Sequence, residues 1–186
     1  MNTTEKLLCL PLSKSVWPEG RIGPWQLQDG YRIVKKAVEL ANDKKSDGTL
    51  LLTATKPKDS IKSELDYMFE VTAIEDLKSG HLYVTPKCFD TPSQIDYAIK
   101  LADLSGYGKL LILCSPLHYL RVKWIVARIP IDSDLKISCK VVFGIPRPKE
   151  VVTDIILTFI YPIIDTLGLD TWFRSWTEKR RLDGLL

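Results

Sequence analysis

Residues 110–128, LLILCSPLHYLRVKWIVAR, contain the transition on which the predicted fold depends. Residues 110–114 form a continuous apolar run, which is typical of a strand buried within a parallel sheet. Ser115-Pro116 follows and opens an amphipathic stretch, since proline is well tolerated at the first position of a helix. The segment therefore predicts a buried strand that leads directly into a helix, with His118 and Arg121 close to the helix start.

Short apolar runs and longer amphipathic stretches alternate in this way through most of the chain. Strands are predicted over residues 6–12, 49–55, 81–86, 109–114 and 136–145, and helices over 29–43, 60–73, 91–106 and 116–128, with further helices after 145. Alternation at roughly thirty-residue intervals indicates a parallel sheet with helices on both faces. The predicted fold is α/β: a three-layer, Rossmann-like domain over residues 1–150 with a mostly parallel sheet of about five strands. Residues 151–186 are predicted to form a helical extension.

The composition is that of an ordinary globular protein: 186 residues, of which 45% are hydrophobic and 26% are charged. A net charge of +3, from 26 basic and 23 acidic residues, argues against a nucleic-acid binder, for which a concentrated basic face is expected. No signal peptide is predicted at the N-terminus. The most apolar segment, 151–169, is interrupted by Asp154, Pro162 and Asp165, so no transmembrane helix is predicted. We therefore expect a cytoplasmic protein.

The four cysteines, Cys9, Cys88, Cys114 and Cys139, lie far apart and form no C-x-x-C pair. Such isolated cysteines are expected to be buried, reduced thiols. The chain has only two histidines, so we expect no metal site.

Polar residues follow the predicted strands, at the sheet edge where open α/β folds bind their ligands. These residues are Ser13 and Lys14, Thr53 to Lys56, Thr85, Ser115 and Arg147. Serine and threonine are also common caps and turn residues, which accounts for each of them singly. Their coincidence on one edge favours a polar pocket.

His118 and Arg121 are the strongest candidates within this pocket. If Ser115 is the N-cap, both share one helix face beside the free N–H groups and the positive end of the helix dipole. A permanent cation and an imidazole that changes charge near neutral pH suit a phosphate, a carboxylate or another anion. The alternative is that His118 packs against the sheet and Arg121 is solvated. Glu64 either orients His118 or is a solvated helix carboxylate.

The sequence contains no nucleophile elbow, phosphate-binding P-loop, dinucleotide fingerprint or zinc-protease motif, so spacing alone names no reaction. Residues 50–68, LLLTATKPKDSIKSELDYM, and 81–121, HLYVTPKCFDTPSQIDYAIKLADLSGYGKLLILCSPLHYLR, resemble the YdcF-like family (DUF218 domain), which includes the SanA- and ElyC-related envelope proteins. The family has a Ser-Glu helix start, an Asn-Thr or Asp-Thr helix start, and a strand ending in Thr-Ser before an H-x-x-R helix. The matching positions are Glu64, Asp90, Thr91, Ser115, His118 and Arg121, and Arg21 corresponds to the arginine after the family's N-terminal loop.

The chain departs from the family pattern at three places: PLSKSVWPEG replaces a glycine-rich turn, TATKPK replaces Ser-Gly-Gly, and Gln94 stands where an asparagine is usual. The resemblance implies a Rossmann-like fold that binds a small anionic or nucleotide-like ligand, such as S-adenosylmethionine. The expected roles are His118 as general acid/base and Glu64 as its orienting partner, with Ser13, Arg21, Thr53, Thr91, Ser115 and Arg121 binding the ligand. A non-catalytic ligand-binding module, or an envelope-related regulatory or assembly module, is the alternative.

The C-terminal tail joins an apolar helix to Trp172, Phe173, Trp176 and the basic cluster 179–181. We expect these residues to cover one face of the sheet and to end in a charged segment. A homodimer surface is the main alternative, because an exposed apolar stripe of this size is otherwise a liability. Attachment to an anionic membrane through tryptophans and adjacent cations is a third interpretation.

Overall fold

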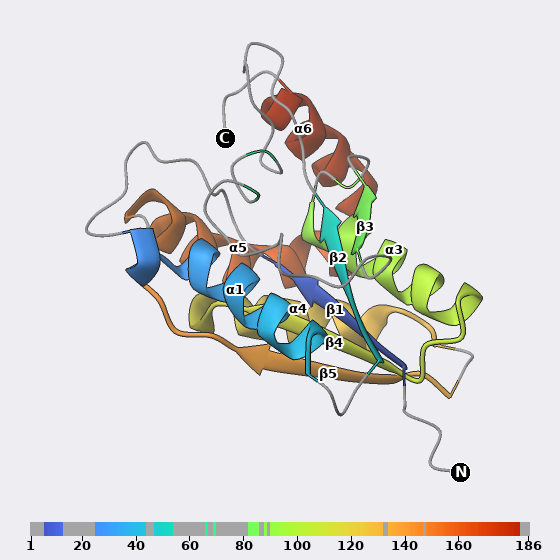
Figure 1. The fold of residues 1–186 in the computed structure, drawn as a ribbon. Helices are drawn as coiled ribbons and strands as arrows, with labels where there is room; N and C mark the ends of the chain where they lie inside the picture. Colours follow the sequence, from blue (N-terminus) through green and yellow to red (C-terminus); the bar gives the residue numbers. More distant parts are fainter. Residues whose placement is uncertain are drawn as a thin grey trace.

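A computed structural model describes residues 6–12, 25–43, 47–53, 66, 69, 82–85, 88, 90–131, 134–146 and 148–182 of the chain. The strands are β1 (Lys6–Pro11), β2 (Asp47–Thr53), β3 (Leu82–Thr85), β4 (Lys109–Cys114) and β5 (Lys136–Val141). The helices are the short 3-10 helix η1 (Trp25–Leu27), α1 (Asp29–Ala41), α3 (Thr91–Leu104), α4 (Pro116–Arg128), α5 (Pro148–Thr166) and α6 (Asp170–Leu182) (Figure 1).

The five strands form one sheet in the order β3-β2-β1-β4-β5, and every neighbouring pair is parallel (Figure 1). The chain builds β1, β2 and β3 toward one side and then returns to place β4 on the other side of β1. This reversal is the topological switch point at which open α/β sheets bind their ligands. The predicted three-layer, Rossmann-like α/β fold is therefore confirmed.

Alternating residues of β1 fill the two halves of the core, since successive side chains of a strand point to opposite faces. Leu7 and Cys9 pack against α1, while Leu8, Leu10 and Leu12 pack on the face covered by α3 and α4. The central strand is thus buried on both faces, as its continuous apolar sequence predicts.

Pro11 ends the pairing of β1 with β2. The N–H of Leu12 donates to the carbonyl of Leu113 on β4 (2.8 Å), so the N–H groups of the odd-numbered residues of β1 point toward β2. Pro11 has no N–H, and the β1–β2 register extends only from Lys6 to Cys9, whereas the β1–β4 register continues to Pro11 itself. The ends of β1 and β2 are therefore not joined at the carboxyl edge of the sheet.

The last strand is shorter than predicted: β5 ends at Val141, whereas the sequence predicted a strand as far as Ile145. Beyond β5 the chain leaves the sheet and reaches the start of α1, where Ile145 pairs with Gln28 in an isolated parallel bridge. Gly144 makes this approach possible, because a Cβ at this position would lie 2.3 Å from the Cα of Asp29. Of the predicted helix over 60–73, the structure describes Asp66 and Phe69, which are both helical.

The C-terminal helices differ from expectation in where they pack. α5 lies against α4, which itself covers the sheet, and α6 follows α5 (Figure 1). Tyr161 of α5 reaches the core cluster on the α3–α4 face, and Phe173 of α6 meets its ring edge-on at 6.3 Å between ring centroids. This segment therefore packs mainly on α4, and Tyr161 is the residue of α5 that contributes to the core on that face of the sheet.

α3 begins with a complete capping box. The Asp90 carboxylate accepts a hydrogen bond from the backbone N–H of Ser93 (2.7 Å), and the Ser93 hydroxyl oxygen accepts one from the N–H of Asp90 (3.3 Å). These bonds satisfy donors that would otherwise have no partner within the helix. They also fix the position of Thr91, the first residue of α3.

Replacing Asp90 with alanine is expected to lower the free energy of unfolding by about 1 kcal/mol, because the capping bond to Ser93 is lost. Urea denaturation measures this loss. Asp96→Ala is the matched control on the same helix, since it removes an exposed pair with Lys100 that contributes less than about 0.5 kcal/mol. Equal losses for the two variants would show that the capping box does not stabilise the start of α3.

Candidate functional site at the carboxyl edge of the sheet

The structure describes five of the eight candidate site residues. Thr53, Thr91, Ser115, His118 and Arg121 lie at the carboxyl end of the sheet or in the first turns of the helices that follow it. The other three, Ser13, Arg21 and Glu64, lie outside the described residues.

Ser115 joins β4 to α4 and is the N-cap of the helix, as the sequence predicts. Its carbonyl oxygen accepts the N–H groups of His118 (3.2 Å) and Tyr119 (3.1 Å), while its hydroxyl makes no capping hydrogen bond. Pro116 is the first helical residue, where a missing N–H leaves no intrahelical bond unmade. The buried hydroxyl of Ser115 is therefore not committed to holding the helix start.

Thr91 and His118 meet at the centre of the candidate site. Thr91 Oγ1 lies 3.1 Å from His118 Nε2, although the two residues are 27 positions apart in the chain. The contact links the first turn of α3 to the first turn of α4. His118 is 1% exposed and Thr91 is partly exposed, so the Thr91 hydroxyl is the more accessible group of the pair.

Thr53 places a further hydroxyl at the same edge. It is the last residue of β2, and alternation from Leu52, which packs toward α1, directs its side chain to the α3–α4 face. The hydroxyl is buried and makes no hydrogen bond within the described part of the chain. A buried hydroxyl without a partner costs about 1–3 kcal/mol.

Arg121 forms a buried ion pair with Asp154 of α5. Arg121 Nη2 lies 3.3 Å from Asp154 Oδ1, and the two side chains are 5% and 4% exposed. The alternative in which Arg121 is solvated is therefore wrong. Because the Asp154 carboxylate meets its charge, Arg121 attracts a further anion less strongly than a lone arginine would.

The sequence did not lead us to expect Asp154 as the ion-pair partner of Arg121. The signal was present: Asp154, Thr158, Tyr161 and Asp165 recur at helical spacing within an otherwise apolar segment. That pattern indicates a polar face on a helix whose other face is apolar. Gln28 and Asp29, which are buried at the start of α1, were also missed.

The thiol beside the site is not a ready nucleophile. Cys114 immediately precedes Ser115, and burial raises the pKa of its thiol to about 12. Burial likewise raises the pKa of Cys9 to about 12 and that of Cys88 to about 11. All four cysteines are free, and Cys139 is partly exposed. Three of the four predicted buried thiols are thus buried.

The raised thiol pKa values predict a loss of stability at alkaline pH. The folded state retains protons that unfolded thiols release near pH 9, so the contribution is complete below that pH and falls as the pH rises toward 12. Urea denaturation at pH 8 and pH 10.5 measures the free energy of unfolding at each pH. Between the two, this free energy should fall less for the Cys9→Ala/Cys114→Ala double variant than for the wild type. The same fall in both proteins would exclude these thiols as its cause.

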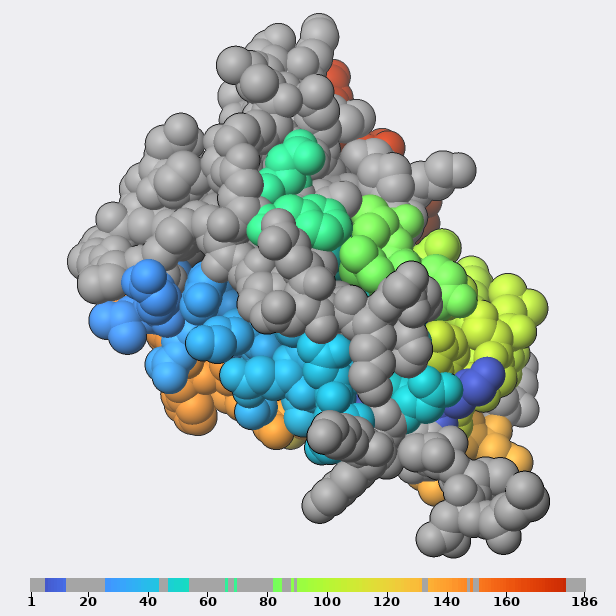
Figure 2. All heavy atoms as spheres, viewed as in Figure 1, coloured from blue at the N-terminus to red at the C-terminus, as the bar shows by residue number. Residues whose placement is uncertain are grey.

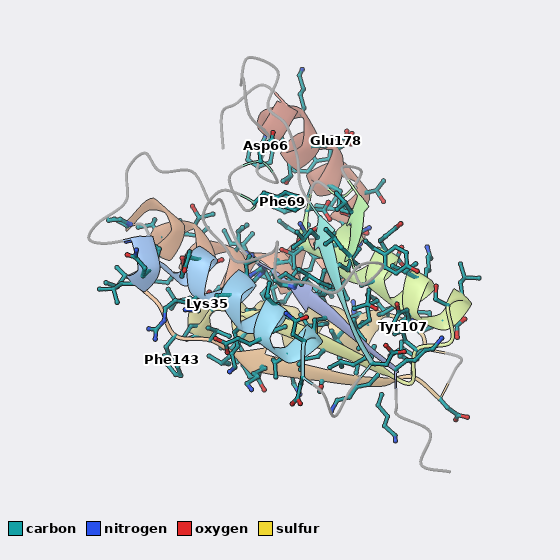
Figure 3. All side chains as sticks on the ribbon, in the orientation of Figure 1. Lys35, Asp66, Phe69, Tyr107, Phe143 and Glu178 are labelled. Carbon is teal, nitrogen blue, oxygen red and sulfur yellow. The ribbon has the colours of Figure 1, made fainter. Side chains whose placement is uncertain are left out.

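A surface groove lies away from these residues, between α1 and β5. It has a volume of about 500 Å³, and its lining includes Arg32, Lys35, Lys140 and Phe143. α1 and the chain of β5 lie side by side in the space-filling view (Figure 2), and Lys35 and Phe143 are on this side of the molecule (Figure 3). None of the candidate site residues lines the groove.

Within the described residues, no three histidine, cysteine or acidic side chains gather in a way that could hold a metal ion. None of the helices in the described ranges is long and apolar enough to cross a membrane. The chain matches no family model, no curated protein and no solved structure. The resemblance to the YdcF-like family therefore stays a prediction.

A double-mutant cycle on Arg121 and Asp154 tests the buried ion pair. Arg121→Met should lower the free energy of unfolding by about 3–5 kcal/mol, because it removes the cation beside a buried carboxylate. Arg121→Met/Asp154→Leu should recover most of this loss, as measured by urea denaturation.

Arg128→Met is the control for that cycle, because it breaks the more exposed pair with Asp165 (2.8 Å) and should cost about 1 kcal/mol or less. Additive losses for Arg121→Met and Asp154→Leu would show that the two buried side chains do not interact energetically.

Proposed function

We propose that the protein binds a small anionic or nucleotide-like ligand at the carboxyl edge of its sheet. The observation that carries this proposal is the contact between Thr91 and His118, which joins the starts of α3 and α4 although β1 and β2 separate the strands that these helices follow. The positive dipole end of α4, where the Ser115 hydroxyl makes no capping bond, favours a phosphate or carboxylate. The hydroxyls of Thr53, Thr91 and Ser115 would form further, uncharged hydrogen bonds with the ligand.

In this proposal Thr91 contacts the ligand and His118 acts through it. His118 is buried behind a partly exposed hydroxyl, so its imidazole fixes the orientation of that hydroxyl. If the ligand is turned over, a proton would pass between the ligand and His118 by way of Thr91 Oγ1, which can both donate and accept. Arg121, with its charge met by Asp154, would position the start of α4 in addition to any contact with the ligand.

The resemblance to the YdcF-like family supports the same proposal from the sequence. Thr91, Ser115, His118 and Arg121 all match motif positions of that family. The resemblance also makes S-adenosylmethionine a ligand to test beside nucleotides and sugar phosphates. The partners we propose are this ligand and a second copy of the chain, with no nucleic acid, in a cytoplasmic setting. A non-catalytic or envelope-related regulatory module using the same pocket is the second candidate, favoured by the burial of His118.

Ligand binding is tested by a thermal-shift screen with nucleotides, S-adenosylmethionine and sugar phosphates. A ligand at a hundredfold its dissociation constant adds about 2.7 kcal/mol, which should raise the Tm of the wild type by roughly 5–10 °C. Thr91→Val should abolish the shift, because it removes the hydroxyl while keeping the shape of the side chain.

Thr49→Val is the matched control for that screen. It removes a hydroxyl that bonds Tyr107 Oη (2.9 Å) at the opposite end of β2, so the ligand shift should persist. Equal shifts in wild type and both variants would place the ligand elsewhere. No shift with any of these compounds in the wild type would remove the proposed ligand classes.

His118→Gln separates an enzyme from a binding module once a ligand is in hand. Glutamine can still bond Thr91 but cannot carry a proton at neutral pH. An enzyme should retain affinity within a few-fold and lose turnover by at least about a hundredfold. If the wild type itself never consumes the bound compound in a single-turnover assay, the binding module is the correct interpretation.

A further inference from the structure

α5 has its polar face turned toward the protein. Asp154 pairs with Arg121, the Thr158 hydroxyl donates to the carbonyl of Leu117 (3.4 Å), and Asp165 accepts from both Arg128 and Trp124. All of these partners belong to α4. A surface helix ordinarily turns its apolar side toward the core, so α5 is inverted relative to that pattern.

The opposite face of α5 is an exposed apolar stripe. It consists of Val152, Ile155, Ile156, Phe159, Ile160 and Ile163, with Leu167 just after the end of the helix, which are each 44–71% exposed. These residues recur at intervals of three and four, so they form one continuous strip along the helix. A strip of this kind on the outside of a globular protein marks an interaction surface.

The charge of the stripe distinguishes between the two surfaces that could cover it, an anionic membrane and another protein surface. From residue 151 to residue 167 the sequence contains no lysine or arginine, and its two acidic residues, Asp154 and Asp165, both pair with α4. A helix that lies on an anionic membrane typically carries cations along its polar face. The neutral strip instead suits an equally neutral surface, against which no charge would be buried.

A second copy of the chain supplies such a surface. A two-fold axis brings the same patch of each copy together, so a neutral apolar strip is its own complement. The seven side chains, with Leu169 and Trp172 exposed just beyond, form an extended apolar surface of the kind that a standard interface of roughly 800 Å² per partner requires. We propose that the outer face of α5 is the interface of a homodimer, with Phe159 near its centre.

Sedimentation velocity of the full chain at 1–100 µM tests this proposal. The wild type should sediment as a species of twice the 21.2 kDa mass of one chain over most of this range. Phe159→Glu should shift the protein to the monomer, because dimerisation would bury a charge at the centre of the interface. Its Tm at low concentration should match that of the wild-type monomer, since Phe159 is 71% exposed within one chain.

Leu104→Glu is the matched control, because Leu104 is a large apolar residue that is 87% exposed at the end of α3, away from α5. This variant should remain dimeric. A wild type that is monomeric throughout the range overturns the proposal, and so does a dimer that survives both Phe159→Glu and Ile163→Glu.

Co-sedimentation with vesicles of phosphatidylcholine and phosphatidylserine identifies the other occupant. A monomeric wild type that binds these vesicles, and a Phe159→Glu variant that does not, would assign the stripe to a membrane surface and would overturn the dimer. None of these outcomes depends on the ligand proposal, which is tested by Thr91 at the sheet edge.

Discussion

The buried ion pair between Arg121 and Asp154 determines how the C-terminal part of the molecule is arranged. A buried guanidinium requires a nearby anion, because desolvating a lone charge costs several kcal/mol. α5 satisfies this requirement only by turning its acidic side toward α4. The apolar residues on its other side then face outward, in an orientation that the contacts of Thr158, Tyr161 and Asp165 also favour.

This arrangement also changes what Arg121 means for the candidate site. An arginine at the start of a helix suggests an anion clamp when the sequence is considered alone. With Asp154 beside it, the guanidinium connects two helices and holds the first turns of α4 in place. Thr91 and His118 are then the stronger candidates for ligand binding, because their contact joins the starts of two separate helices.

The sequence predicted the strands and helices because local patterns determine them. Apolar runs predicted β4 with the observed bounds and β1 to within one residue, whereas β2 begins and ends two residues before its predicted range. Ser115-Pro116 located the start of α4. Local patterns failed where distant segments decide the outcome: β5 stops at Val141, and Ile145, predicted as its last residue, bonds instead to the start of α1. Asp154 likewise pairs with a helix that lies 26 or more residues earlier. The contact of Thr91 with His118 likewise depends on how α3 crosses the sheet, which spacing does not encode.

Pro11 shows how a single residue shapes the edge on which the candidate site lies. A residue with an N–H at this position could extend the β1–β2 ladder and draw the two strand ends together. Proline instead forgoes a backbone hydrogen bond at the centre of the sheet, where such bonds are best shielded from water. The β1–β2 ladder therefore ends before Thr53, so local cohesion is given up on the side of β1 away from the switch point, while β1 and β4 stay paired as far as Pro11.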